Sequence, residues 1–186
     1  MTTGAQAYLL AAGMGRRAGG PKAWRTFDGQ PLLARQIEFL RGIFPAERIA
    51  VSIQPGWEER CRLLDPGICW TAVDPQAPAL ASVLALARTL PLDRWTFLYH
   101  VDMRVWEPEL WRFLADRVVE ADKDGFEALA PCFQGAKGHP ILLSPRIKDA
   151  LSVLDPAKDR LDHWLSSRRV SVVEVPFACI RDNWNE

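Results

Sequence analysis

Short apolar runs alternate with amphipathic stretches along most of this chain. The apolar runs are rich in β-branched or aromatic residues and are bounded by turn residues, a pattern typical of buried strands. The runs predict strands at residues 8–12, 49–53, 68–73, 95–101, 126–131, 139–143 and 170–175.

Between these runs, apolar residues recur at the 3.6-residue period of an amphipathic helix. One helix is predicted around Leu32, Leu33, Ile37, Leu40 and Ile43, and another around Leu110, Trp111, Leu114 and Val118. Residues 79–90 and 159–167 are predicted as further helices. Strands that are apolar on both faces and alternate with helices predict a mostly parallel sheet covered on both sides, the Rossmann-like three-layer α/β/α fold class. Ligands of such folds bind at the carboxyl ends of the strands.

Length and composition favour one soluble domain. The 186 residues suit a single domain spanning residues 1–186. Lys plus Arg and Asp plus Glu both number 23, and this balance argues against a nucleic-acid or membrane partner. The first apolar run is too short for a signal sequence or a membrane span. The four cysteines are scattered and form no CxxC pattern, so we expect reduced thiols in a cytoplasmic protein.

The loop after the first predicted strand carries the clearest chemical signal. It reads Gly13-Met14-Gly15-Arg16-Arg17-Ala18-Gly19-Gly20-Pro21-Lys22. Its glycines let the backbone approach a ligand and adopt positive φ angles, so that successive N–H groups can form an anion-binding nest. Arg16, Arg17 and Lys22 add positive charge for phosphate oxygens. The loop therefore favours a phosphate site, against the alternative of a solvated basic turn.

Two better-known phosphate loops fit this segment poorly. A P-loop requires GxxxxGK[ST], but Pro21 separates Gly20 from Lys22, and Ala23 follows the lysine. Gly13, Gly15 and Ala18 formally match the dinucleotide pattern GxGxxG/A. That pattern should open a helix, which Gly19-Gly20-Pro21 would disrupt.

The segment resembles the LAAGxSxRMGxPK signature of the molybdenum-cofactor nucleotidyltransferases, the cytidylyl- and guanylyltransferases of the wider nucleotidyltransferase superfamily. Gly15 replaces a serine and Ala18 a methionine, changes that we expect to leave the backbone cradle intact. The resemblance implies that the nucleotide is bound by the loop and the end of the preceding strand. The implied residues are Leu10, Ala11, Ala12, Gly13, Gly15, Arg16 and Gly19, with Arg17 and Lys22 as catalytic cations.

Further matches follow in the family's order. The segment from Pro78 to Val83 resembles GMLASV, which implies that Ser82 lines the nucleotide site, although a serine near a helix N-terminus can equally serve the backbone. His100-Val101-Asp102 resembles PVD, which implies that Asp102 is catalytic and holds Mg²⁺. We expect His100, which replaces the proline, to pack.

Two later segments complete the resemblance. Gly138-His139-Pro140 resembles the GHP segment beside the acceptor pocket, which implies acceptor-binding roles for His139 and Lys137. Asn183-Trp184-Asn185-Glu186 resembles the start of a terminal metal-binding motif, which implies that Asn185 is a second Mg²⁺ ligand.

The resemblance implies a Mg²⁺-dependent nucleotidyltransferase. The enzyme would move a nucleoside monophosphate from a nucleoside triphosphate to a small phosphorylated acceptor such as molybdopterin or the molybdenum cofactor, with release of pyrophosphate. Ala12 in LAAG, rather than LAGG, favours CTP over GTP. One alternative is a sugar-1-phosphate nucleotidyltransferase, and another is a non-catalytic nucleotide-binding accessory protein that serves a molybdenum enzyme.

Overall fold

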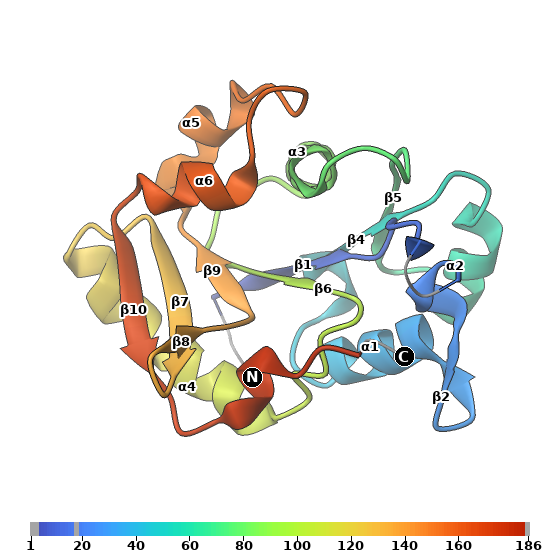
Figure 1. Cartoon of the computed structure of the whole chain (residues 1–186), viewed down its shortest axis with the longest axis horizontal. Helices are drawn as coiled ribbons and strands as arrows, with labels where there is room; N and C mark the ends of the chain where they lie inside the picture. The colour runs from blue at the N-terminus through green and yellow to red at the C-terminus, as the bar shows by residue number, and fades with distance from the viewer. Residues whose placement is uncertain (1–3, 17–18, 185–186) are drawn as a thin grey trace.

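The computed structural model describes residues 4–16 and 19–184, which form one main sheet with helices on both faces (Figure 1). The eight-stranded sheet has the order β10-β7-β9-β6-β1-β4-β5, with β8 paired to β7. Its strands are β1 (Gln6–Leu10), β4 (Ile49–Ile53), β5 (Cys69–Ala72), β6 (Thr96–His100), β7 (Ala128–Phe133), β8 (Ala136–Lys137), β9 (Ile141–Leu143) and β10 (Val170–Glu174). The predicted strands and the predicted fold class are confirmed.

The helices divide between the two faces of the sheet. They are α1 (Leu32–Arg41), α2 (Glu58–Leu64), α3 (Ala79–Thr89), α4 (Pro108–Lys123), α5 (Lys148–Ser152) and α6 (Leu161–Ser166). Apolar residues of α1, α2 and α4 join one buried cluster, and those of α3, α5 and α6 join the other. Figure 1 shows α3, α5 and α6 on the opposite side of the sheet from α1 and α4.

The alternation of side chains along β1 explains this layering. Ala7 and Leu9 belong to the first apolar cluster, whereas Tyr8 and Leu10 belong to the second. Successive side chains of a strand point to opposite faces, so a strand that is buried on both faces must be apolar at every position. This requirement explains why the predicted strands are continuous apolar runs.

Trp111 of α4 is the centre of the first cluster. Its indole is fully buried and stacks on Phe97 of β6 with ring centroids 4.8 Å apart. Tyr99 and Phe44 meet it edge-on. This aromatic group fixes α4 beneath β6 and thereby supports the strand that ends at the candidate site.

The sheet contains antiparallel strands that the sequence pattern does not predict. β9 runs antiparallel to both β6 and β7, and β8 runs antiparallel to β7. The remaining strand pairs of this sheet are parallel.

Several short elements were also missed. The hairpin β2 (Thr26–Phe27) and β3 (Gln30–Pro31) turns at Asp28 and Gly29, whose φ angles of 47° and 83° are those of a type I′ turn. The helix α2 was missed because Cys61 is its one buried residue, which leaves no apolar period to detect. None of the helices that the structure describes is long and apolar enough to cross a membrane.

Candidate active site

The candidate site lies where β1 and β6 end side by side. These strands are parallel neighbours, with Leu10 paired to His100 at their carboxyl ends. The loops that follow therefore meet at one edge of the sheet, as the topology rule for α/β folds predicts. They border a cavity of about 710 Å³. Its lining residues are Leu10, Ala12, Gly13, Gly15, Arg16, Lys22, Asp74, Pro75, Ala77, Ala79, Ser82, His100, Val101, Asp102 and Asn183.

The glycine-rich loop closes on itself through Gly15. This residue has φ = 60°, and the N–H of Gly20 donates to its carbonyl over 3.1 Å. A Cβ atom at position 15 would lie 1.9 Å from the Gly20 carbonyl oxygen. The backbone has therefore closed into space that any side chain would need, so this loop requires the glycine that replaces the family's serine.

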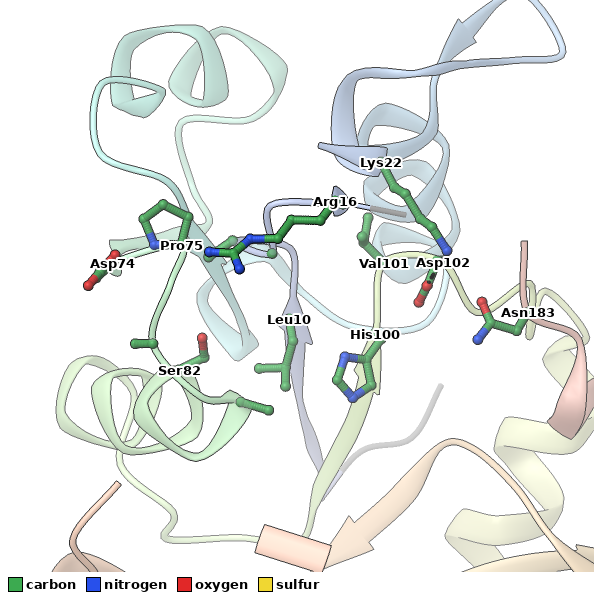
Figure 2. A pocket seen from close by; sticks show the side chains of 15 residues that line it. Leu10, Arg16, Lys22, Asp74, Pro75, Ser82, His100, Val101, Asp102 and Asn183 are labelled. Atoms are coloured by element: carbon green, nitrogen blue, oxygen red, sulfur yellow. Dashed lines mark hydrogen bonds and ion pairs between the residues drawn. The ribbon is translucent and has the colours of Figure 1, made fainter. Parts of the chain in front are cut away.

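Lys22 and Asp102 meet at the rim of the cavity, as Figure 2 shows. Their Nζ and Oδ2 atoms are 2.8 Å apart, and their side chains are 15% and 21% exposed. Lys22 begins a short 3₁₀ helix after the glycine-rich loop, and Asp102 follows β6. The two residues share one cleft, as the sequence predicts. A partly buried cation and carboxylate side by side can bind phosphate oxygens and a hard metal ion.

The C-terminal segment joins this pair from a third direction. Its residue Asn183 forms a β-bridge with Met103. The main-chain N–H of Trp184 donates to the Asp102 carbonyl over 2.8 Å, and the Trp184 carbonyl accepts from Lys22 Nζ over 2.6 Å. The Trp184 indole is buried and lies edge-on to Phe27 of β2. The segment thus holds the lysine and the aspartate loop together.

The start of α3 forms the opposite side of the cavity. Ala79 and Ser82 line it from the first turn of the helix, and Ser82 is 7% exposed. Pro78 precedes the helix and provides no side-chain cap. Because the N–H groups of a first turn carry partial positive charge, this helix end favours an anion in the cavity. Arg16 extends from the glycine-rich loop towards Pro75, between α3 and Lys22 (Figure 2).

A second cavity of about 470 Å³ adjoins the first. It is lined by Pro78, Ala79, Leu80, Leu98, His100, His139, Ile141, Arg160, Leu161, Asp162 and Leu165. His100 and Ala79 border both cavities. Burial lowers the pKa of His100, and burial together with the neighbouring His100 ring lowers the pKa of His139 to about 4. Both imidazoles are therefore neutral near pH 7.

The structure brings together most, but not all, of the predicted site residues. Leu10, Ala12, Gly13, Gly15, Arg16, Lys22, Ser82 and Asp102 line the first cavity, and His139 lines the second. Among the described residues, those that line the two cavities do not include Ala11, Gly19 or Lys137. Ala11 is 1% exposed and its N–H donates to the Ser52 main chain, whereas Lys137 is exposed on the short strand β8. Arg17 and Asn185 lie outside the described residues.

Several polar lining residues were missed or interpreted differently. Asp74 follows β5, and the rule that places ligands at strand carboxyl ends could have identified it. Asn183 was considered only as the first residue of the terminal motif, and no role was predicted for it. His100 was expected to pack and does contact His139, but it also lines both cavities. Arg160 precedes α6 and had no recognisable pattern around it.

Asp102 is the candidate for holding a metal ion. Its carboxylate lines the cavity, and the Asn183 side chain points towards it (Figure 2). The described residues contain no group of three His, Cys, Asp or Glu side chains that could hold a metal by themselves. Carboxylate and amide oxygens are ligands that suit Mg²⁺, which typically takes one or two carboxylates and completes its shell with substrate phosphates. The side chains present therefore fit a magnesium ion shared with a phosphate ligand.

The strand order and this arrangement of loops are those of the α/β nucleotidyltransferase fold. Residues 7–172 match the family described as MobA-like NTP transferase domain, and the chain belongs to this family. The predicted family resemblance is confirmed, and membership supports nucleotidyltransferase activity.

Individual relatives are more distant. The bifunctional protein GlmU of Chromobacterium violaceum is 35% identical over 85 residues, which is 45% of this chain and 18% of that protein. The bifunctional protein GlmU of Stenotrophomonas maltophilia is 33% identical over 110 residues, or 50% of this chain and 24% of that protein. The chain thus matches less than a quarter of the length of these curated relatives.

Among solved structures, Rv0371c of Mycobacterium tuberculosis superposes with a TM-score of 0.77 at 20% identity, covering 97% of this chain and 92% of that one. A manganese complex of Rv0371c has a TM-score of 0.67 at 18% identity, covering 92% and 88%. The molybdopterin-guanine dinucleotide biosynthesis protein A of Archaeoglobus fulgidus has a TM-score of 0.65 at 18% identity, covering 91% and 83%. At these identities the likeness establishes the fold.

Proposed function

We propose that this protein transfers a nucleoside monophosphate from a nucleoside triphosphate, CTP in preference to GTP, to a phosphorylated acceptor such as molybdopterin, and releases pyrophosphate. The observation that carries the proposal is the contact between Lys22 and Asp102 over 2.8 Å at the rim of a cavity that the glycine-rich loop also lines. Phosphoryl transfer depends mainly on positioning and charge neutralisation, and these groups supply both.

The triphosphate would lie against the glycine-rich loop and the start of α3. Arg16 and Lys22 would neutralise its phosphate oxygens, together with Arg17, and the main-chain N–H groups of the loop would donate to them. Lys22 starts from a position shared with Asp102, so its ammonium group can turn to the phosphates without a change in the fold.

Mg²⁺ is the metal that we assign to this site. Asp102 would hold it, with Asn183 beside it and Asn185 as the further ligand that the family resemblance implies. Bound there, the ion would withdraw charge from the phosphate oxygens. Asp102 lies two residues after the end of β6, and the core packing of that strand keeps the Asp102 backbone in place.

The acceptor would occupy the second cavity, beside His139. One oxygen of its terminal phosphate would attack the α-phosphorus in line, while the bond from that phosphorus to the α,β-bridging oxygen breaks. The bridging oxygen leaves as part of pyrophosphate. The acceptor phosphate is already an anion, so the step needs no general base from the protein.

The base preference rests on Ala12. Ala12 lines the first cavity, and a glycine at this position would leave more room. Less room favours the smaller pyrimidine ring, in agreement with the preference that the LAAG sequence implies. Comparison of pyrophosphate release from CTP and GTP with molybdopterin as the acceptor tests this preference.

Variants of the central pair test the proposal itself. We expect Lys22→Ala and Asp102→Asn each to reduce turnover by about 10²-fold or more, the effect typical of removing one group that stabilises transition-state charge. Matched controls are Lys158→Ala and Asp93→Asn, which remove exposed partners of surface ion pairs. Near-normal turnover in either Lys22→Ala or Asp102→Asn would contradict the assignment, provided that the melting temperatures match.

The same assay separates the alternative functions. Turnover with glucose 1-phosphate but not with molybdopterin would indicate a sugar-1-phosphate nucleotidyltransferase. Tight binding of CTP in the presence of Mg²⁺, with no turnover on either acceptor, would indicate an accessory protein that serves a molybdenum enzyme.

A further inference from the structure

His100 stands at the junction of the two cavities. It is the last residue of β6, and its imidazole lines both the first cavity and the second. In Figure 2 the ring lies between Leu10 and Asn183, below Asp102. A molecule that reaches from the second cavity to a triphosphate in the first must therefore pass this ring.

The His100 ring packs against His139. The two ring centroids are 5.7 Å apart and the planes meet at 88°, an edge-to-face contact. His139 is itself fixed, because its main-chain N–H donates to the Ile180 carbonyl over 2.8 Å. The buried Nδ1 of His139 has no hydrogen-bond partner among the described residues.

The surroundings of His100 change sharply from one cavity to the other. The lining of the first cavity includes the charged side chains of Arg16, Lys22 and Asp102. The second is bordered mainly by the apolar side chains of Leu80, Leu98, Ile141, Leu161 and Leu165. Arg160 and Asp162 also line it, but they pair with each other over 2.8 Å and are 67% and 62% exposed. Among the residues that the structure describes, the half-buried polar side chains that line this cavity are thus the two histidines.

A neutral imidazole suits this junction chemically. It donates one hydrogen bond and accepts another without adding charge. Such a group can orient a phosphate monoester that arrives from an apolar pocket, while the charged groups are left to the triphosphate.

We propose that His100 is a specificity-determining residue, whose imidazole N–H donates to the terminal phosphate of the acceptor and holds it facing the triphosphate. His139 is the positioning residue that holds the His100 ring. The acceptor class is then a phosphate monoester with an apolar or aromatic body. This inference rests on the proposed function, since it places the acceptor in the second cavity.

The histidine composition of the chain allows a direct test by NMR. The chain has three histidines, and His163 is exposed on α6 and is not among the residues that line either cavity. Its imidazole signal therefore serves as an internal reference. The protein is saturated with Mg²⁺ and α,β-methylene CTP, and phenyl phosphate is then titrated as a simple aromatic phosphate monoester. We expect the His100 and His139 signals to shift and the His163 signal to stay in place, whereas benzyl alcohol, which lacks the phosphate, leaves His100 unshifted.

Two variants separate hydrogen bonding from shape. His100→Phe keeps a ring but removes the donor, and we expect it to bind phenyl phosphate about 10- to 100-fold more weakly, the range for a lost hydrogen bond to a charged group. His100→Gln keeps a donor, and we expect it to recover most of that affinity. Any loss of affinity for the CTP analogue should be smaller than the loss for phenyl phosphate, because the cationic groups and the glycine-rich loop are unchanged.

Three results would overturn the inference: no shift of His100 in the wild-type protein, undiminished phenyl phosphate binding by His100→Phe, or a loss of CTP-analogue affinity as large as the loss for phenyl phosphate. These results would leave the proposed function standing if wild-type protein turns over CTP with molybdopterin. Conversely, failure of the proposed function is recognised by the absence of CTP-analogue binding before any phenyl phosphate is added.

Discussion

Replacement of Gly15 by alanine should open the phosphate loop. The new Cβ atom would lie 1.9 Å from the Gly20 carbonyl oxygen, whereas Cβ atoms essentially never approach a heavy atom within 3.0 Å. The loop must therefore widen by about 1 Å at this point. The hydrogen bond from Gly20 N–H to the Gly15 carbonyl, 3.1 Å long, closes the same turn and would be stretched or lost.

The magnitude follows from two contributions. Alanine at φ = 60° costs about 1–2 kcal/mol relative to glycine. Loss of one main-chain hydrogen bond costs about 1 kcal/mol more. If the loop relaxes in the free protein, triphosphate binding must restore the closed form against roughly 2–3 kcal/mol before the collision of the Cβ atom is added, so binding should be weaker by at least about 30- to 150-fold. The melting temperature should change little, because Gly15 belongs to neither apolar cluster.

Calorimetric titration with CTP and Mg²⁺ measures the effect, and Gly19→Ala is the matched control. Gly19 also has a left-handed φ, 71°, but a Cβ there would meet only the end of the Arg25 side chain, 3.9 Å away. Gly19→Ala carries the backbone strain without the collision, so we expect a smaller loss, of about 5- to 30-fold. CTP affinity of Gly15→Ala within threefold of wild type, or no weaker than that of Gly19→Ala, would refute the reasoning.

Three further predictions concern charge, packing and pH. Arg16→Ala should weaken CTP binding by about tenfold and reduce its salt dependence, with partial recovery in Arg16→Lys; unchanged affinity at low salt would remove Arg16 from the site. Trp111→Ala should lower the free energy of unfolding by about 3–5 kcal/mol, because the fully buried indole stacks on Phe97. Urea denaturation measures this change, and a decrease of less than about 1 kcal/mol would contradict the prediction. His139, with a pKa lowered to about 4, should make the protein less stable as pH falls from about 6.5 to 4, since the unfolded chain takes up the proton first. This loss is at most about 3 kcal/mol and should shrink in His139→Gln; an equal pH dependence in that variant would exclude His139 as its source.

The layers of the fold could be predicted from the sequence because burial on both faces demands unbroken apolar strands. Strand direction could not. The run that contains β9 is apolar, like the runs that form the parallel strands, and its antiparallel pairing with β6 and β7 depends on the route of the connecting chain. That route includes the short strand β8 after the turn at Gln134 and Gly135, whose φ angles are 51° and 78°.

The meeting of Lys22 and Asp102 could also be predicted, because each follows the carboxyl end of a strand in a parallel sheet. The sequence could not predict that Lys137 does not line either cavity, although this residue lies two positions before His139. Lys137 belongs to β8 and is exposed, whereas His139 is drawn inward by its main-chain bond to Ile180. Two residues that are close in sequence therefore have different surroundings, because the distant segment at Ile180 anchors His139 and not Lys137.

Gly15 shows what a family comparison misses. Its replacement of serine was interpreted as a harmless loss of side chain. The turn has instead contracted until Gly20 occupies the place of that side chain. A close approach between two backbone segments leaves no mark in composition or periodicity, so coordinates were needed to find it.

The bonds around Lys22 span unusually long stretches of chain. Its ammonium group contacts Asp102, 80 positions away, and Trp184, 162 positions away. Contacts that enclose such long loops are among the last to form during folding and carry the largest entropy of closure. On gentle heating, the C-terminal segment at Trp184 can detach from Lys22 and Asp102 while the central sheet stays intact, since local openings require less free energy than global unfolding. Thermal inactivation of this protein should therefore begin several degrees below the temperature at which its circular dichroism signal is lost.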